Sequence, residues 1–322
     1  MSNKEITHVC LVETVYTLFL YMLLVEEEDY EHTFFFCSSL LPAEIKKKLP
    51  QSHCFKLPHK RYHKWIFRIL LYYTSALRWP FIKRCTIYGS DNYLFSSGII
   101  RNNRLNLLED GTSNYSLTYV DPKLYTLRSW LMGSIAACGC GGRAPNVEKI
   151  YLTGLLSIPE EIRSKVELFS VRDHWEKLTV TYQRKILSLF DISIDVIRDL
   201  RRYTDVLFTQ PMYEDGLLIK EEEIALYKQL LSNSNKCKLV IKVHPRDKMD
   251  YRDLFPDAYI LKTKVPMELL SILGVQFKEV YTVFSTAALS LPYKANIHFM
   301  GTSVHPNLVK HRGIIEYDDC FF

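Results

Sequence analysis

The chain has 322 residues, which at roughly 100–200 residues per domain predicts about two domains. Hydrophobic residues make up 48% and charged residues 24%, a globular composition that excludes collagen-like, low-complexity and disordered proteins. The formal net charge of +5 is too small to indicate nucleic-acid binding, although it suits an anionic substrate. We therefore expect a globular protein with no nucleic-acid partner.

The cysteines and the N-terminal segment indicate a reducing compartment. The eight cysteines are scattered along the chain, which is typical of reduced thiols. The one close pair, Cys138 and Cys140, lacks the spacing of common zinc sites, so we expect no metal site. Lys4 and Glu5 precede a short apolar run, unlike a signal peptide, and residues 15–25 are too few to span a bilayer. We therefore expect the protein to be cytoplasmic.

Short apolar runs alternate with helical stretches in the first half of the chain. Strands are expected at residues 6–12, 32–37, 85–88, 105–108, 149–152 and 166–170, and helices at 14–24, 62–77 and 122–137. A strand, a short helical crossover and a second strand are typical of parallel βαβ units. This half therefore predicts a layered α/β domain with a buried, mostly parallel sheet.

The same alternation begins again near residue 203. Strands are expected at residues 205–209, 238–243, 258–261, 279–283 and 297–300, and helices at 221–231, 266–273 and 285–291. We place the domain boundary inside the helical stretch 179–202, giving domains 1–185 and 186–322. The predicted fold is α/β of the GT-B type, with two Rossmann-like domains whose parallel sheets face a central cleft. Nucleotide-sugar enzymes commonly have this architecture.

Two acidic triples follow expected strands, where ligands of parallel sheets bind. Glu109, Asp110 and Gly111 follow the strand at 105–108. Adjacent carboxylates raise each other's proton affinity, which suits one of them to act as a general base. Glu214, Asp215 and the following glycine form a rival triple. The alternative interpretation of each triple is an acidic turn, in the first case one that caps a helix.

Basic and hydroxyl side chains follow three other expected strands. His244 lies between Lys242 and Arg246, in a local positive field that suits a phosphate ligand or a proton donor. Pro245 fixes the turn that follows. Ser285 and Thr286 begin an expected helix, whose free amides can bind phosphate, although capping alone explains the serine. Gln210 and Pro211 follow the strand at 205–209, where Gln210 can contact a base or a sugar.

With these motifs in order, the chain resembles bacterial sialyltransferases, which share an acidic-acidic-Gly motif, a His-Pro motif and a Ser-Ser/Thr motif. The strings at residues 151–155, 209–211 and 242–247, together with 14–18, look most like the lipooligosaccharide sialyltransferases of glycosyltransferase family 52. The resemblance runs from about residue 6 to residue 310.

The resemblance implies a GT-B fold and inverting transfer of sialic acid from CMP-sialic acid to a terminal galactose-type sugar of a lipooligosaccharide or capsule glycan, without metal or cofactor. It implies that Asp110, or alternatively Asp215, is the base and that His244 meets the departing CMP phosphate. The implied donor-side residues are Gln210, Pro211, Lys242, His244, Pro245, Ser285 and Thr286. The implied acceptor-side residues are Glu109, Gly111 and Thr112.

Several alternatives stay open. One alternative is a related glycosyltransferase whose donor carries a sugar other than sialic acid, for example glucose. Another is a non-catalytic nucleotide- or carbohydrate-binding module. The basic stretch 59–64, followed by Trp65 and Phe67, predicts either a solvated helix start or a basic-aromatic face that rests on anionic lipid. A lipooligosaccharide acceptor would bring the protein to the cytoplasmic face of the inner membrane. A homodimer is compatible with the sequence.

Overall fold

The computed structural model describes residues 5–111, 114–115, 122–137, 140–261, 264–288 and 291–316. The chain divides into two compact units, Met1–Leu189 and Phe190–Phe322, and each is described by itself. Three predicted features lie outside the described residues: Thr112, the Cys138 half of the close cysteine pair, and the side chain of Thr286. No helix of the described part is both long and apolar enough to cross a bilayer.

Unit 1 contains a seven-stranded sheet in which every strand pair is parallel. In spatial order the strands are β3 (Gln51–Phe55), β2 (Thr33–Ser38), β1 (His8–Val12), β4 (Thr86–Gly89), β5 (Leu105–Leu108), β6 (Val147–Leu152) and β7 (Val166–Leu168). The central strands β1 and β5 are mostly apolar and mostly buried, as coverage of both faces of the sheet requires. The strand order reverses direction between β1 and β4, where doubly wound sheets bind ligands.

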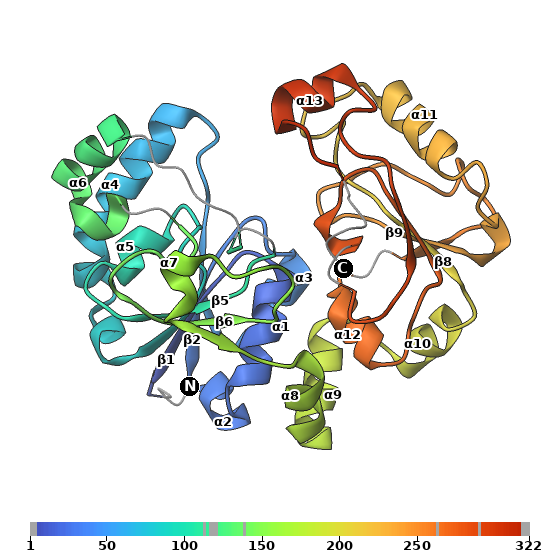
Figure 1. Ribbon diagram of the computed structural model, residues 1–322. Helices are drawn as coiled ribbons and strands as arrows, with labels where there is room; N and C mark the ends of the chain where they lie inside the picture. The colour runs from blue at the N-terminus through green and yellow to red at the C-terminus, as the bar shows by residue number, and fades with distance from the viewer. Residues whose placement is uncertain are drawn as a thin grey trace. The chain divides into compact units, whose positions relative to one another are not determined.

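Helices cover both faces of this sheet (Figure 1). They are α1 (Val15–Leu24), α2 (Glu27–Glu31), α3 (Ala43–Lys46), α4 (Arg61–Arg78), α5 (Ser96–Ile100), α6 (Pro122–Ala137), α7 (Glu160–Arg163), α8 (Val171–Lys177) and α9 (Val180–Leu189). One group contains α1 and α8, which touch each other, and another contains α4, α5 and α6. Helix α1 is capped by Thr14, whose Oγ1 accepts the backbone N–H of Thr17 at 3.1 Å.

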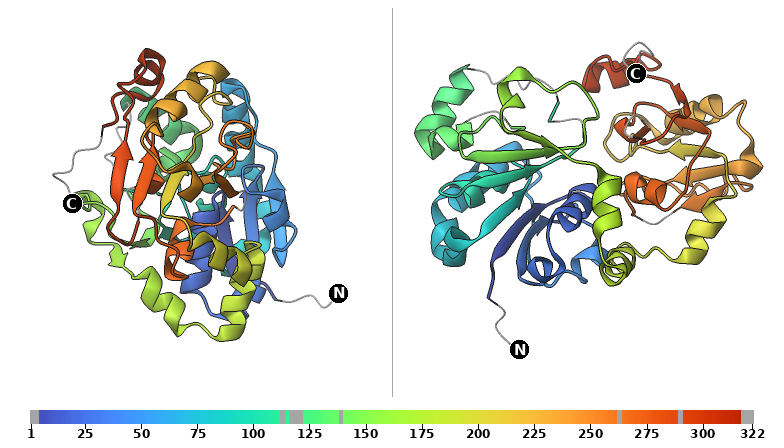
Figure 2. Two further views of the ribbon diagram at one scale, coloured as in Figure 1. Left: turned by 90° about the vertical axis from the view of Figure 1, so that its right-hand side faces the viewer. Right: turned by 60° about the horizontal axis from the view of Figure 1, so that its bottom comes forward.

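Unit 2 contains a five-stranded parallel sheet with helices on both sides, which both views in Figure 2 show. The strands, in spatial order, are β10 (Tyr259–Leu261), β9 (Leu239–Lys242), β8 (Asp205–Phe208), β11 (Glu279–Thr282) and β12 (Asn296–Phe299). The helices are α10 (Ile194–Leu200), α11 (Lys220–Leu230), α12 (Met267–Ile272) and α13 (Pro306–Arg312). The order reverses between β8 and β11, so their carboxyl ends form this sheet's ligand-binding position.

The predicted α/β fold with two parallel sheets is confirmed, but some predicted elements differ. The helix expected at residues 285–291 is wrong: of its described residues only Thr286–Ala288 are helical, as one 3₁₀ turn. Pro292 disfavours helical backbone just before it, which limits any helix there. The helical stretch expected at 179–202 is two helices, α9 and α10, and between them Asp191 takes a left-handed φ of 54°. Strand β3 was not predicted, because its residues are largely polar and lie at the sheet's edge.

Candidate functional site

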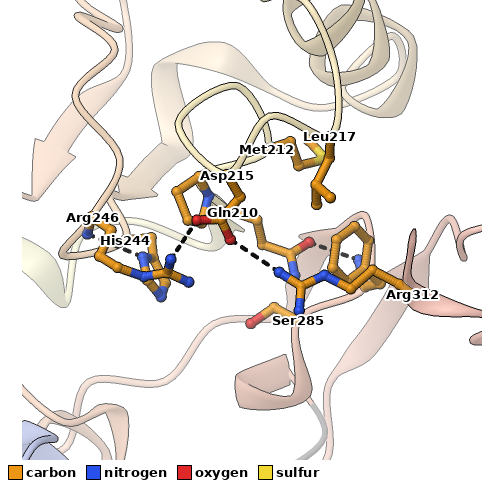
Figure 3. Close-up of a pocket in the computed structure, with 10 residues that line it drawn as sticks. Gln210, Met212, Asp215, Leu217, His244, Arg246, Ser285 and Arg312 are labelled. Carbon is orange, nitrogen blue, oxygen red and sulfur yellow. Dashed lines mark hydrogen bonds and ion pairs between the residues drawn. The ribbon is translucent and has the colours of Figure 1, made fainter. Parts of the chain in front are cut away.

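A pocket of about 220 Å³ lies in unit 2 where the order of the sheet reverses (Figure 3). It is lined by Gln210, Pro211, Met212, Asp215, Leu217, His244, Arg246, Phe284, Ser285 and Arg312. These residues follow the carboxyl ends of β8, β9 and β11, except that Arg312 ends helix α13. The structure therefore brings together five residues expected from the sequence, Gln210, Pro211, Asp215, His244 and Ser285.

Gln210 joins the two strands that flank the reversal. Its Oε1 accepts the backbone N–H of Phe284 at 3.0 Å, and its own N–H donates to the hydroxyl of Tyr227 at 2.7 Å. Ser285, the residue after Phe284, donates its backbone N–H to Thr282 Oγ1 at 2.9 Å. These bonds fix the backbone around the pocket, and Ser285 contributes a hydroxyl to its lining.

His244 is held in one tautomer by its neighbours. Its Nδ1 accepts the backbone N–H of Arg246 at 3.1 Å, so the proton of the neutral ring lies on Nε2. The pKa of His244 is lowered to about 4, mainly by burial and also by the charges of Arg246 and Lys242, against the opposing charge of Asp215. At neutral pH the ring is therefore uncharged and has one N–H to donate.

A buried carboxylate supports this histidine from behind. Thr209 Oγ1 accepts the backbone N–H of His244 at 2.9 Å and donates to Asp247 Oδ2 at 2.6 Å. Asp247 also accepts the hydroxyl of Tyr251 at 2.7 Å and the N–H of Met249 at 2.9 Å. Burial raises the pKa of Asp247, which these hydrogen bonds oppose. Asp247 thus positions the His244 backbone through Thr209, a role that the sequence did not indicate.

Asp215 binds two arginines in the same pocket. Its Oδ1 pairs with the guanidinium of Arg246, and its Oδ2 pairs with Arg312 Nη2 at 3.0 Å. Gly216 follows with a φ of +69°, a left-handed backbone that favours glycine and turns the chain sharply. The three side chains together carry a net positive charge, which suits an anionic ligand. Arg312 was not found from the sequence, because no spacing connects it to the other motifs.

Two donor-side predictions fall outside this pocket. Pro245 lines a neighbouring pocket of about 230 Å³, which it shares with His244, Tyr251 and Ile260. Lys242 lines neither pocket among the described residues. Burial lowers its pKa to about 8, with the charge of Glu268 opposing.

The expected helix N-terminus at residue 285 is a 3₁₀ turn. Phosphate binding there cannot rest on a helix dipole.

In unit 1, Glu109 is a fully buried part of the framework. Its carboxylate accepts hydrogen bonds from the hydroxyls of Tyr16 and Tyr115, both at 2.6 Å. It also accepts hydrogen bonds from the backbone N–H of Thr153 at 2.7 Å and from the hydroxyl of Thr153 at 2.9 Å. This carboxylate, expected on the acceptor side, has 0% exposure and so holds the end of β5 in place rather than meeting solvent. Gly111 has a φ of +64°, a left-handed backbone that favours glycine.

Asp110 lies beside the first turn of α1. Its Oδ1 accepts the hydroxyls of Thr14 and Thr17, both at 3.2 Å. Burial raises its pKa, and these hydrogen bonds oppose the shift. Glu13, at the carboxyl end of β1, has a pKa raised to about 7 by burial, with a further contribution from the charge of Asp110. Asp110 and Glu13 are thus two partly buried carboxylates at the carboxyl edge of the sheet in unit 1.

Comparison with known families gives a match over most of the chain. The model of glycosyltransferase family 52 matches residues 82–308. An uncharacterized protein of Haemophilus influenzae is 35% identical over 302 residues, covering 94% of this chain and 96% of that protein.

Two solved structures share the fold. A 2,6-sialyltransferase from Photobacterium sp. JT-ISH-224, crystallised with the donor product CMP and the acceptor lactose, has a TM-score of 0.59 at 12% identity and covers 94% of this chain and 75% of that chain. An α/β-galactoside α-2,3-sialyltransferase from Photobacterium phosphoreum has a TM-score of 0.55 at 12% identity. The match covers 92% of this chain and 90% of that chain. At these identities the comparison shows the fold, which is that of GT-B sialyltransferases.

Proposed function

We propose that this chain, which belongs to glycosyltransferase family 52, transfers sialic acid from CMP-sialic acid to a terminal galactose-type sugar of a lipooligosaccharide or capsule glycan. The observation that carries the proposal is the unit 2 pocket, where His244 Nε2–H, the Ser285 hydroxyl and the guanidiniums of Arg246 and Arg312 gather at the sheet reversal. The Photobacterium enzymes of the same fold act as sialyltransferases, and one was crystallised with CMP and lactose.

On the leaving side, the bond between the anomeric carbon and the CMP phosphate oxygen breaks as an oxocarbenium-like transition state forms. Negative charge then builds on the phosphate, where donors aimed at it stabilise the transition state. His244 Nε2–H and the Ser285 hydroxyl supply such donors. Because Nδ1 of His244 accepts the N–H of Arg246, the ring stays neutral rather than acting as an imidazolium acid. Its Nε2–H stabilises the departing CMP as a hydrogen-bond donor.

On the attacking side, the acceptor hydroxyl bonds to the anomeric carbon and gives its proton to a carboxylate, with inversion at that carbon. We assign this carboxylate to Asp110, whose pKa is raised by burial, because the attacking hydroxyl and its base must lie on the face opposite the leaving phosphate. Asp215 is the alternative; it lines the pocket of His244, but both of its oxygens pair with arginines. Substitution of each aspartate separates the two assignments.

The two arginines of the pocket can bind the anions of the donor. Arg246 and Arg312 both pair with Asp215, which holds their guanidiniums in place. CMP-sialic acid carries a phosphate and a carboxylate, and planar guanidiniums bind either group in a bidentate manner. We assign Arg246 and Arg312 to these anions in the donor complex. The reaction then needs no metal, because protein cations neutralise the leaving group.

Nucleotide binding tests the donor class. CMP and CDP are expected to raise the melting temperature of the protein in proportion to their affinity, whereas UMP and UDP at equal concentration are not. Stabilisation by the uridine nucleotides instead would favour a different donor sugar and overturn the CMP-sialic acid assignment. Stabilisation by CMP without transfer to any galactoside would favour a non-catalytic binding module.

A further inference from the structure

Helix α4 presents large apolar side chains to solvent along one face. At 3.6 residues per turn, positions spaced by three and four fall on the same side of a helix. The exposed members are Tyr62 (73% exposed), Ile66 (37%), Leu70 (58%), Tyr73 (54%) and Leu77 (85%). The buried residues Leu71, Tyr72 and Ser75 lie on the opposite side. A surface helix of a globular protein normally turns polar residues outward, so this pattern requires an explanation.

Helix α6 extends the apolar surface. Its side chains Trp130 (81% exposed), Leu127 (49%) and Tyr125 (39%) are also exposed. The two helices lie side by side in unit 1 (Figure 1), and the hydroxyl of Tyr73 donates to the carbonyl of Leu131 at 2.6 Å. We call the exposed apolar residues of the two helices the α4–α6 face.

The charged side chains within the two helices have one sign. The sequence contains no Asp or Glu from residue 45 to residue 90, nor within α6. Arg61 and Lys64 are exposed at the start of α4. Arg68 and Arg128 lie close enough that the charge of Arg128 adds to the burial that lowers the pKa of Arg68. The Nε atoms of both are buried without a hydrogen-bond partner among the described residues.

We propose that the α4–α6 face docks on the surface of an anionic phospholipid bilayer. Interfacial helices combine an apolar face rich in aromatic and leucine side chains with flanking lysines and arginines. The apolar stripe would enter the acyl boundary, while the cations meet anionic headgroups, an attraction that salt screens. A second copy of the chain fits less well, because two such faces would bring like charges together. This inference does not depend on the assignment of donor or acceptor.

Vesicle flotation of the full chain tests the proposal. The wild type is expected to bind phosphatidylcholine vesicles containing phosphatidylglycerol at least about tenfold more tightly than vesicles of phosphatidylcholine alone, and high salt should weaken the binding. The triple variant Tyr62→Ser, Leu70→Ser, Leu77→Ser should lose about tenfold in binding. All three side chains are more than half exposed, so the fold should persist, and a melting curve checks it.

A matched control removes apolar residues of similar exposure elsewhere. Val180→Ser with Ile194→Ser, at 62% and 77% exposure, should leave vesicle binding unchanged. Equal binding by the triple variant and the wild type, or no vesicle binding by the wild type, would overturn the proposal. A dimer in light scattering that the triple variant converts to a monomer, without vesicle binding, would also overturn it and assign the face to contact between copies. Transfer to a soluble acceptor should be unchanged in the triple variant, so failure here differs from failure of the proposed function.

Discussion

The backbone N–H of Arg246 donates to Nδ1 of His244 across 3.1 Å, which leaves the ring proton on Nε2. The guanidinium of the same arginine binds Asp215. Arg246 therefore fixes the tautomer of His244 with its backbone and binds Asp215 with its side chain. A tight turn after β9 makes both contacts possible, since Asp247 N–H donates to the carbonyl of His244 at 3.0 Å.

We predict that His244→Ala lowers kcat for sialyl transfer by about 100-fold or more, because loss of one donor to the charge that develops in a transition state typically costs that much. The fold should stay intact, since the supporting contact of Thr209 is to the backbone of residue 244. Steady-state kinetics with a melting curve measures both. His311→Ala, an exposed histidine in α13, is the control and should transfer normally. A His244→Ala enzyme with unchanged kcat would remove His244 from the reaction.

Asp110→Asn should lower kcat by about 100-fold or more, whereas Asp215→Asn should lower it by less than about tenfold. The amide keeps the size of the side chain but cannot accept the hydroxyl proton. Kinetics of the two variants, measured side by side, decides between the two carboxylates. The reverse outcome, with Asp215→Asn inactive and Asp110→Asn active, would assign the base to Asp215.

Arg312→Gln is expected to raise KM for CMP-sialic acid by about tenfold, the usual scale for losing a charge-assisted hydrogen bond. Its effect on KM for the acceptor should be small. Lys310→Gln, which removes an exposed cation of the same helix that does not line the pocket, should change neither constant. Equal KM values for donor in Arg312→Gln and the wild type would show that Arg312 only braces Asp215.

Glu223 anchors the loop that carries Asp215, because its carboxylate accepts the N–H of Tyr213 at 2.7 Å. Burial is the main cause that raises its pKa from 4.5 to about 7. The folded protein thus holds this proton more tightly than the unfolded chain does. The stability that protonated Glu223 contributes is fully present below pH 4.5 and is lost as the pH rises through 7. Glu223→Gln cannot titrate.

The free energy of unfolding of Glu223→Gln, relative to the wild type, should therefore increase by about 3 kcal/mol between pH 4.5 and pH 8. Urea unfolding of both proteins at the two pH values measures the difference. A difference that is constant with pH would show that Glu223 is ionised in the folded protein throughout this range.

Much of the unit 2 site could be predicted because local sequence determines it. The apolar, β-branched run Leu239–Lys242 forms β9, and a polar residue placed just after such a strand reaches the carboxyl edge of the sheet. His244 and Ser285 were found in this way. The resemblance to family 52, read from the same motifs, is confirmed by the family match over residues 82–308.

The rest of the site depends on long-range contacts that no local pattern carries. Arg312 reaches the pocket from the end of α13, and Asp247 supports His244 through Thr209, a residue of another strand end. The burial of Glu109 depends on Tyr16 and Thr153, which tertiary folding brings from α1 and the end of β6. An acidic-acidic-Gly triple therefore looks the same in sequence whether its first carboxylate is buried or exposed.

Incubation of the purified protein with CMP-sialic acid and lactose, with and without EDTA, tests the central claim most directly. We predict that sialyl-lactose and CMP form in equal amounts, that EDTA does not change the rate, and that His244→Ala abolishes the product. Absence of transfer from CMP-sialic acid to lactose and to lipooligosaccharide, together with transfer from a uridine-diphosphate sugar, would contradict the account.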